Sequence, residues 1–179
     1  PGNLDCTIVY ELNNNNELLI DFKATSDKDT IVNMTNHNYW NFHGHGDSYQ
    51  NNEDHVVQIN SKSICETDEQ SIPTGKILNV EGSKFDLQND FLINKDFLSS
   101  GGIDHNYVVD DQSMKEAVAK IYSKKTGLGV EYYTNQHGIQ FYTGNMMLDK
   151  YIGKHDKLYG LQYGMCLEPQ HFPDAINHL

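Results

Sequence analysis

The fold of this chain is best followed outward from the stretch Cys166-Leu167-Glu168-Pro169-Gln170-His171-Phe172-Pro173. The apolar residues 163–167 predict a buried strand. Proline has no amide hydrogen and favours an extended backbone in the residue before it. We therefore expect Glu168 at the point where a strand ends and a fixed loop begins, a rigid position for a catalytic or binding carboxylate. The alternative is an ordinary solvated glutamate at the edge of a sheet.

Short segments of alternating apolar and polar residues fill most of the chain before this stretch. They predict strands over residues 5–11, 17–23, 31–40, 56–59, 107–109, 129–134 and 138–143. Residues 114–122 permit a helix, but the alternation over 118–122 favours a strand. The asparagines 13–16 suit a turn, so the first two strands are expected to form a hairpin. No amphipathic segment has a convincing helical length. The sequence therefore predicts an all-β sandwich.

The composition limits the class of protein and its partners. A length of 179 residues suits one globular domain, and the formal net charge is −12. Nucleic-acid binding needs clustered Lys and Arg, which this sequence lacks, and no apolar run is long enough to cross a bilayer. The three cysteines, Cys6, Cys65 and Cys166, are far apart and odd in number. They form no disulfide framework and no zinc pattern, so we expect a reducing, cytoplasmic compartment.

The predicted strand 31–40 has an unusual face. Alternation places Thr35, His37 and Tyr39 on one side, and this mixture of polar and aromatic groups suits a ligand cleft better than a core. Several further histidines follow in a loop rich in Gly and Asn, but no cysteine or carboxylate lies at a convincing ligand spacing. We therefore predict no metal site. A histidine such as His37 can also serve a purely structural role.

Four stretches together resemble the aldose 1-epimerase family, also called galactose mutarotase. They are Thr35-Asn36-His37-Asn38-Tyr39, Gly102-Ile103-Asp104-His105-Asn106, Gly138-Ile139-Gln140-Phe141-Tyr142-Thr143-Gly144-Asn145 and Leu167-Glu168-Pro169-Gln170-His171-Phe172-Pro173-Asp174. Each is a weak signal by itself, but they occur in the family's order. Two residues differ from the usual pattern, since Trp40 replaces a Phe and Pro169 replaces a Thr.

The resemblance implies a large antiparallel β-sandwich of the galactose mutarotase type and a considerably longer chain. We therefore expect residues 1–179 to be a single mutarotase-like β-sandwich domain that lacks the family's N-terminal half and last strands. Family members also hold the sugar with an N-terminal Asn-Arg pair and a second His, for which this sequence has no match. The missing N-terminal segment of the same protein is thus an expected partner.

The activity that the resemblance implies is isomerisation of a hexose such as galactose or glucose between its α and β anomers. A base takes the proton of the C1 hydroxyl while an acid protonates the ring oxygen, and no cofactor is required. By resemblance, Glu168 is the base and His37 is the acid, while Asp104 and Gln140 hold the sugar. A carboxylate accepts protons at neutral pH, and imidazole can carry one in both directions.

Two other functions fit the sequence. The first alternative is a non-catalytic carbohydrate-binding β-sandwich. The second is a mutarotase domain cut from a larger enzyme of sugar metabolism. Tyr39, Trp40, Tyr142 and Phe172 offer an apolar wall for a sugar, although aromatic residues in strands more often belong to a core. A hexose 6-phosphate is a less favoured substrate, because no cluster of Lys and Arg is present to bind phosphate.

Overall fold

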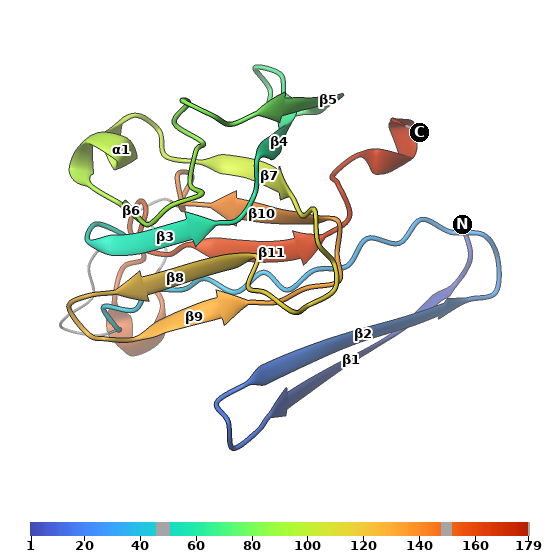
Figure 1. Cartoon of the computed structure of the whole chain (residues 1–179). Coiled ribbons are helices and arrows are strands. Elements are labelled where there is room, and N and C mark those ends of the chain that lie inside the picture. Colours follow the sequence, from blue (N-terminus) through green and yellow to red (C-terminus); the bar gives the residue numbers. More distant parts are fainter. Residues whose placement is uncertain (46–50, 148–151, 179) are drawn as a thin grey trace. The chain divides into compact units, whose positions relative to one another are not determined.

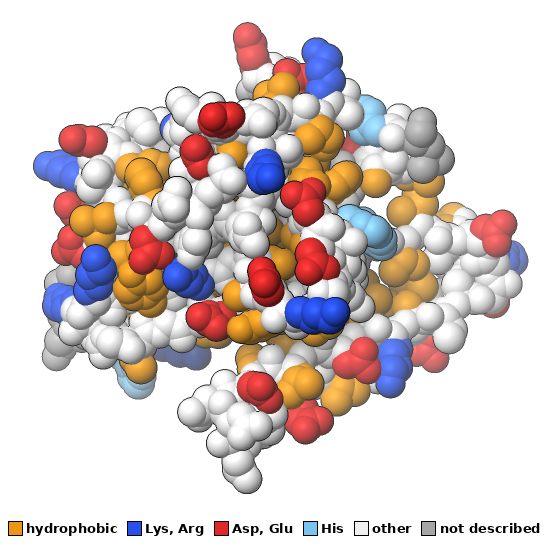
Figure 2. Space-filling view, in the orientation of Figure 1, with side chains coloured by type: hydrophobic (Ala, Val, Ile, Leu, Met, Phe, Trp, Pro, Cys, Tyr) orange, Lys and Arg blue, Asp and Glu red, His pale blue; other side chains and the backbone are white. Residues whose placement is uncertain are grey.

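The computed structural model describes residues 1–45, 51–147 and 152–178. The backbone divides into two compact units, Pro1–Met34 and Thr35–Leu179. The expectation of a single domain over residues 1–179 stays a prediction. Within the described residues, no helix is long and apolar enough to span a membrane. On the face shown in Figure 2, acidic and lysine side chains are interspersed.

The first unit is the predicted β-hairpin. Strands β1 (Leu4–Leu12) and β2 (Leu18–Ser26) pair antiparallel in continuous register (Figure 1). The turn between them is closed by Asn13, whose Oδ1 accepts the amides of Asn15 at 2.9 Å and Glu17 at 3.1 Å. Asn16 adopts a left-handed backbone with φ 61°, which asparagine tolerates better than most residues. The asparagine run therefore fixes the hairpin locally, as the sequence predicted.

The second unit contains two antiparallel sheets. The five-stranded sheet has the order β11-β10-β7-β4-β5, and the four-stranded sheet has the order β6-β3-β8-β9. The strands are β3 (His55–Ile59), β4 (Ser63–Thr67), β5 (Pro73–Asn79), β6 (Phe91–Leu92), β7 (Asp104–Val108), β8 (Ala119–Ser123), β9 (Gly129–Tyr132), β10 (Gly138–Tyr142) and β11 (Cys166–Gln170). Helical turns are short: α1 (Lys95–Ser99), η1 (Lys154–Asp156) and η2 (Ala175–Asn177). The predicted antiparallel, all-β architecture is confirmed.

One hydrophobic core takes residues from both sheets. Val57 of β3 and Ile121 of β8 belong to the same buried cluster as Ile139 and Phe141 of β10 and Leu167 of β11. Burying such a side chain fully contributes roughly 1.5–3 kcal/mol. Side chains alternate along a strand. The residues of β10 and β11 that lie between the buried ones therefore face the other side of the five-stranded sheet.

Two strand predictions near the candidate site were wrong. β11 continues through Pro169 to Gln170, so Glu168 lies inside the strand and not at its end. Proline is tolerated there because β11 is the last strand in the order of its sheet, where an edge nitrogen needs no ladder partner. The predicted strand over 31–40 does not form. In that segment Trp40 makes an isolated bridge to Met165, and the preceding residues are irregular.

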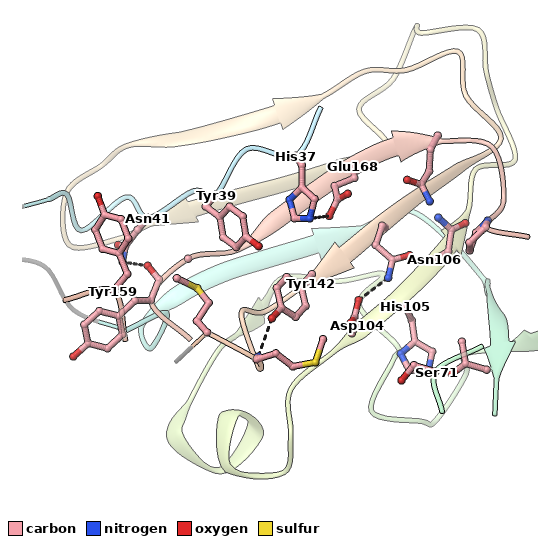
Figure 3. Close-up of a pocket in the computed structure, with 18 of the residues that line it drawn as sticks. His37, Tyr39, Asn41, Ser71, Asp104, His105, Asn106, Tyr142, Tyr159 and Glu168 are labelled. Carbon is pink, nitrogen blue, oxygen red and sulfur yellow. Dashed lines mark hydrogen bonds and ion pairs between the residues drawn. The ribbon is translucent and has the colours of Figure 1, made fainter. Parts of the chain in front are cut away.

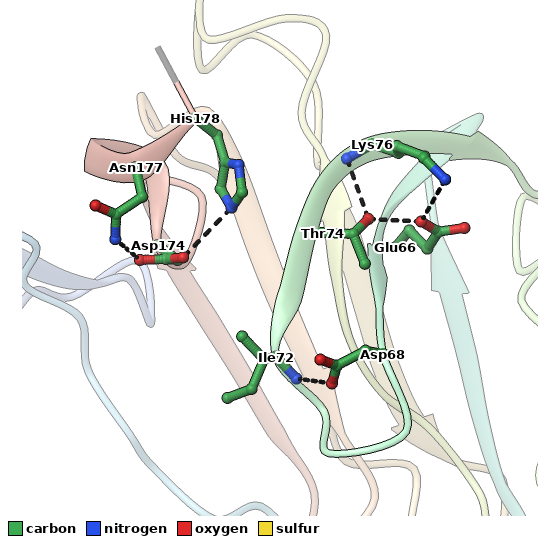
Figure 4. A network of polar contacts seen from close by, with 8 residues as sticks. All are labelled: Glu66, Asp68, Ile72, Thr74, Lys76, Asp174, Asn177 and His178. Carbon is green, nitrogen blue, oxygen red and sulfur yellow. Dashed lines mark hydrogen bonds and ion pairs between the residues drawn. The ribbon is translucent and has the colours of Figure 1, made fainter.

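The hairpin of β4 and β5 was not predicted, because Pro73 and Gly75 suggest a loop over residues 68–76. Figure 4 shows how polar side chains join its strands. Glu66 accepts a hydrogen bond from the Thr74 hydroxyl at 2.5 Å and forms an ion pair with Lys76 at 3.5 Å. The local sequence pattern does not show these contacts between side chains of the two strands.

Candidate active site

The polar face of the five-stranded sheet carries the candidate site. Gln140 of β10 lies directly opposite Glu168 of β11 on one side and Asn106 of β7 on the other. Tyr142, two residues along β10, lies between Cys166 and Asp104 in the same way. Residues that face each other in an antiparallel ladder project to the same side. The sheet register therefore gathers these groups in one cleft of about 1200 Å³ (Figure 3).

His37 reaches the cleft from the irregular segment before Trp40. The Trp40 amide donates to the Met165 carbonyl at 2.7 Å, and the Met165 amide donates back at 2.9 Å. This bridge ties the segment before Trp40 to the residue that precedes strand β11, which carries Glu168. The His37 Nε2 atom lies 3.4 Å from Glu168 Oε1. The two residues predicted as acid and base are thus brought into contact.

The environments of these two side chains differ. The Glu168 side chain is 8% exposed, whereas that of His37 is 52% exposed. Burial raises the pKa of Glu168 above its usual value, the nearby charge of Asp104 raises it further, and His37 partly lowers it. A carboxylate with a raised pKa is a stronger base than an ordinary glutamate. The pair therefore combines a shielded carboxylate with an imidazole that solvent and a ligand can reach.

Asp104 and Gln140 are joined beside this pair. The Gln140 Nε2 atom donates to Asp104 Oδ1 at 2.7 Å across neighbouring strands (Figure 3). Both side chains line the cleft, so all four residues predicted as site residues lie around one cavity. Carboxylate and carboxamide oxygens accept hydrogen bonds from hydroxyl groups, and the amide also donates. The arrangement is suited to a polyhydroxylated ligand.

A family model described as aldose 1-epimerase matches residues 1–179. The chain belongs to this family. It is 38% identical over 181 residues to galactose mutarotase of Rattus norvegicus, covering 99% of this chain and 52% of the relative. It is 32% identical over 185 residues to aldose 1-epimerase of Escherichia coli K12, with the same two coverages. The chain thus spans about half the length of the curated relatives it matches.

Solved structures of the aldose 1-epimerase family support the same fold. A crystal structure of an aldose epimerase homologue from C. elegans superposes with a TM-score of 0.81 at 25% identity, covering 95% of this chain and 51% of that one. Galactose 1-epimerase from Lactobacillus acidophilus gives a TM-score of 0.79 at 27% identity, covering 97% of this chain and 50% of that one. The galactose mutarotase-like β-sandwich predicted by resemblance is thereby confirmed.

Two residues of this aldose 1-epimerase site were not predicted from the sequence. Cys166 lies two residues before Glu168 and Asn106 lies two residues after Asp104, so the period of the strands would have placed each on the same face. Cys166 is fully buried, and its thiol lies close enough to the Tyr39 hydroxyl for each group to affect the pKa of the other. No sequence spacing marks this thiol as a site residue, and the cysteines by themselves indicate only the redox compartment.

Cys166 also bears on whether the site could hold a metal. Ligand atoms of His37, Cys166 and Glu168 all lie within 4.8 Å of one another. Metal binding would need the thiolate, and burial raises the pKa of the Cys166 thiol above its usual range in the metal-free site. The expectation that the site needs no metal stays a prediction.

Not every histidine near the cleft has a chemical role. His55 is fully buried, and its Nε2 accepts the Phe42 amide at 2.9 Å while its Nδ1 lies 3.1 Å from the Asn52 carbonyl. Burial lowers the pKa of His55 to about 4, so its ring is neutral at physiological pH. His55 is therefore a structural histidine that holds the loop after Trp40.

A glycine turn sets the position of Asp104. Gly102 adopts φ 57°, and a Cβ atom there would overlap the Thr143 hydroxyl oxygen, which accepts the Ile103 amide at 2.9 Å. Gly102→Ala is expected to lower the free energy of unfolding by about 1–3 kcal/mol, from backbone strain and from displacement of Thr143. Urea unfolding measures the loss. Gly127→Ala is the control, because Gly127 has φ 73° but open space around a Cβ. Equal losses in both variants would show that the contact with Thr143 is unimportant.

Proposed function

We propose that the protein interconverts the α and β anomers of a free hexose such as galactose or glucose. The observation that carries this proposal is the 3.4 Å contact between His37 Nε2 and Glu168 Oε1 at one cleft of a member of the aldose 1-epimerase family. Anomer exchange needs a base and an acid that act on two oxygens bonded to the same carbon. Two adjacent side chains of these types meet that requirement.

The reaction follows from the protonation states. Glu168, as a carboxylate, removes the proton of the C1 hydroxyl, while His37, as imidazolium, gives a proton to the ring oxygen. The bond from C1 to the ring oxygen breaks and leaves an open-chain aldehyde. Rotation about the C1–C2 bond presents the other face of the carbonyl, and the ring closes with the two proton transfers reversed. Both side chains end in their starting states, so no cofactor takes part.

Asp104 and Gln140 are proposed to hold the sugar hydroxyls during this rotation. Their mutual hydrogen bond of 2.7 Å fixes both groups on rigid strands. The carboxylates of Asp104 and Glu168 line the same cleft, and Lys154 lines it as well. The sequence contains no arginine. The two carboxylates repel a phosphate group close to the acid–base pair, so they favour an uncharged hexose over a hexose phosphate.

Further contacts to the sugar are proposed to come from outside these residues. This proposal is supported by the length of the relatives, because the chain matches only 52% of the length of the rat galactose mutarotase. The Asn-Arg pair and second His implied by the family resemblance have no match in this sequence. We also propose a cytoplasmic location, because Cys6, Cys65 and Cys166 are free thiols.

Polarimetry of freshly dissolved α-D-galactose tests the proposed activity. The first-order rate of change in optical rotation is expected to rise in proportion to protein concentration. Isothermal titration calorimetry with galactose, with galactitol as a ligand that cannot form a ring, separates binding from turnover. Binding of galactose with a rotation rate equal to that of buffer would replace the proposal with a non-catalytic sugar-binding function.

The rate is expected to depend on pH through Glu168. This residue acts as a carboxylate, so kcat/KM falls as the pH drops through its pKa, which burial and Asp104 raise above the ordinary value of 4.5. Asp104→Asn removes one of the raising charges and is expected to move this acid limb to lower pH, while KM increases. Asp90→Asn is the control, because it makes the same change of charge at a residue that directly precedes β6 of the four-stranded sheet. An unchanged acid limb in Asp104→Asn would contradict the assignment of Glu168 as the base.

A further inference from the structure

His37 lacks the rigid support that the other proposed site residues have. Glu168, Asp104 and Gln140 all lie on strands of one sheet, whereas His37 lies in an irregular segment and is half exposed. The nearest ladder contact of its segment is the bridge at Trp40. A proton donor that must meet the ring oxygen in both directions of the reaction needs a fixed ring orientation. Contacts of the imidazole itself must supply it.

The tyrosine two residues later supplies such a contact. The rings of His37 and Tyr39 are stacked, with centroids 5.0 Å apart and an interplanar angle of 16°. Residues two apart in an extended segment project to the same side, which explains why both reach the cleft. The imidazole thus lies between a flat aromatic surface and the carboxylate of Glu168 (Figure 3).

Tyr39 is itself bordered on three sides. Its hydroxyl lies close enough to the thiol of the buried Cys166 for each group to affect the pKa of the other. The edge of its ring meets Tyr142 at a centroid distance of 6.4 Å and an angle of 81°. Its ring also passes close over Gly164, where an added Cβ would lie 3.2 Å from Tyr39 Cδ1. Tyr142 belongs to β10 and Cys166 to β11. Tyr39 therefore packs against the sheet that carries Glu168, and this packing limits the movement of its own segment.

We propose that Tyr39 is the positioning residue that holds the His37 imidazole in register with Glu168 for proton transfer. The inference rests on the proposed function, because it assigns Tyr39 a part in the same acid–base step. Tyr39 acts through His37 by stacking, which requires the ring and not its hydroxyl. The aromatic surface is therefore the essential feature, and the hydroxyl is secondary.

The test compares two substitutions of this residue in the mutarotation assay. Tyr39→Leu removes the stacking surface and is expected to lower kcat by roughly 10- to 100-fold, as a misplaced catalytic group does. KM is expected to change little. Tyr39→Phe keeps the ring and should retain most of the parent kcat. Tyr122→Leu controls for the general effect of replacing tyrosine with leucine. Tyr122 lies on β8, and its hydroxyl donates a hydrogen bond to Asp90 at 2.9 Å.

A spectroscopic readout separates positioning from stability. The ring protons of His37 should carry a ring-current shift in NMR spectra of the parent and of Tyr39→Phe, and lose it in Tyr39→Leu. A folded Tyr39→Leu protein with the parent kcat would overturn the inference. So would Tyr39→Phe with a loss as large as that of Tyr39→Leu, because the hydroxyl would then be the active group. A higher KM at unchanged kcat in Tyr39→Leu would also overturn it, by making Tyr39 a sugar contact.

Failure of the proposed function can be recognised separately. A parent protein that does not accelerate mutarotation contradicts the epimerase proposal, and with it the role of Tyr39 in proton transfer. The NMR comparison then still reports whether Tyr39 orients the His37 ring. Normal mutarotation by the parent, combined with full kcat in the folded Tyr39→Leu variant, contradicts only the inference about Tyr39.

Discussion

Glu168→Gln is expected to lower kcat by roughly 10²–10⁴-fold, the range that a positioned general base contributes. Glutamine has nearly the same shape and can still hydrogen-bond to His37, but its amide cannot accept the proton of the C1 hydroxyl at neutral pH. The loss should therefore appear in kcat, with little change in the binding of galactose. Polarimetry gives the rate, and calorimetry gives the affinity.

Glu66→Gln is the matched control for that substitution. Glu66 lies on β4 of the same five-stranded sheet, where it bonds to Thr74 and Lys76 (Figure 4). Its loss should weaken only surface contacts, which contribute little to stability, and leave kcat unchanged. Circular dichroism and the midpoint of thermal unfolding establish that both variants are folded. A folded Glu168→Gln protein with the parent rate would rule out Glu168 as the base.

His37→Asn is expected to lower kcat by a similar factor of roughly 10²–10⁴. Asparagine keeps a hydrogen-bonding group near Glu168 but cannot deliver a proton to the ring oxygen. A second effect follows from charge. His37 lowers the pKa of Glu168, so its removal should move the acid limb of any remaining activity to higher pH. This direction is opposite to that expected for Asp104→Asn, and pH–rate profiles of the two variants measure the difference.

His137→Asn provides the control for this histidine. His137 is exposed next to the start of β10, and its ring lies 5.3 Å from that of His171. The same chemical change there should leave both kcat and its pH dependence at the parent values. Parent activity in a folded His37→Asn protein would require another proton donor. The acid–base pair described above would then be wrong in one of its two members.

Local features of the fold were accessible from the sequence because they depend on neighbouring residues. The asparagine run predicted the turn of the first hairpin, and the alternation over residues 138–143 predicted strand β10. The same reasoning was wrong for residues 31–40. Their pattern resembles a strand, but a strand needs a partner ladder, and the local sequence cannot show whether one is available.

By itself, the sequence determined the all-β class, the membership of the aldose 1-epimerase family and the side chains with suitable chemistry. These depend on residue identity and on a period of two along each strand. The tertiary structure alone decided that His37 meets Glu168, because the sheet register and the bridge from Trp40 to Met165 join segments far apart in the chain. It also decided the raised pKa of Glu168, since burial and the approach of Asp104 arise only when the strands pair.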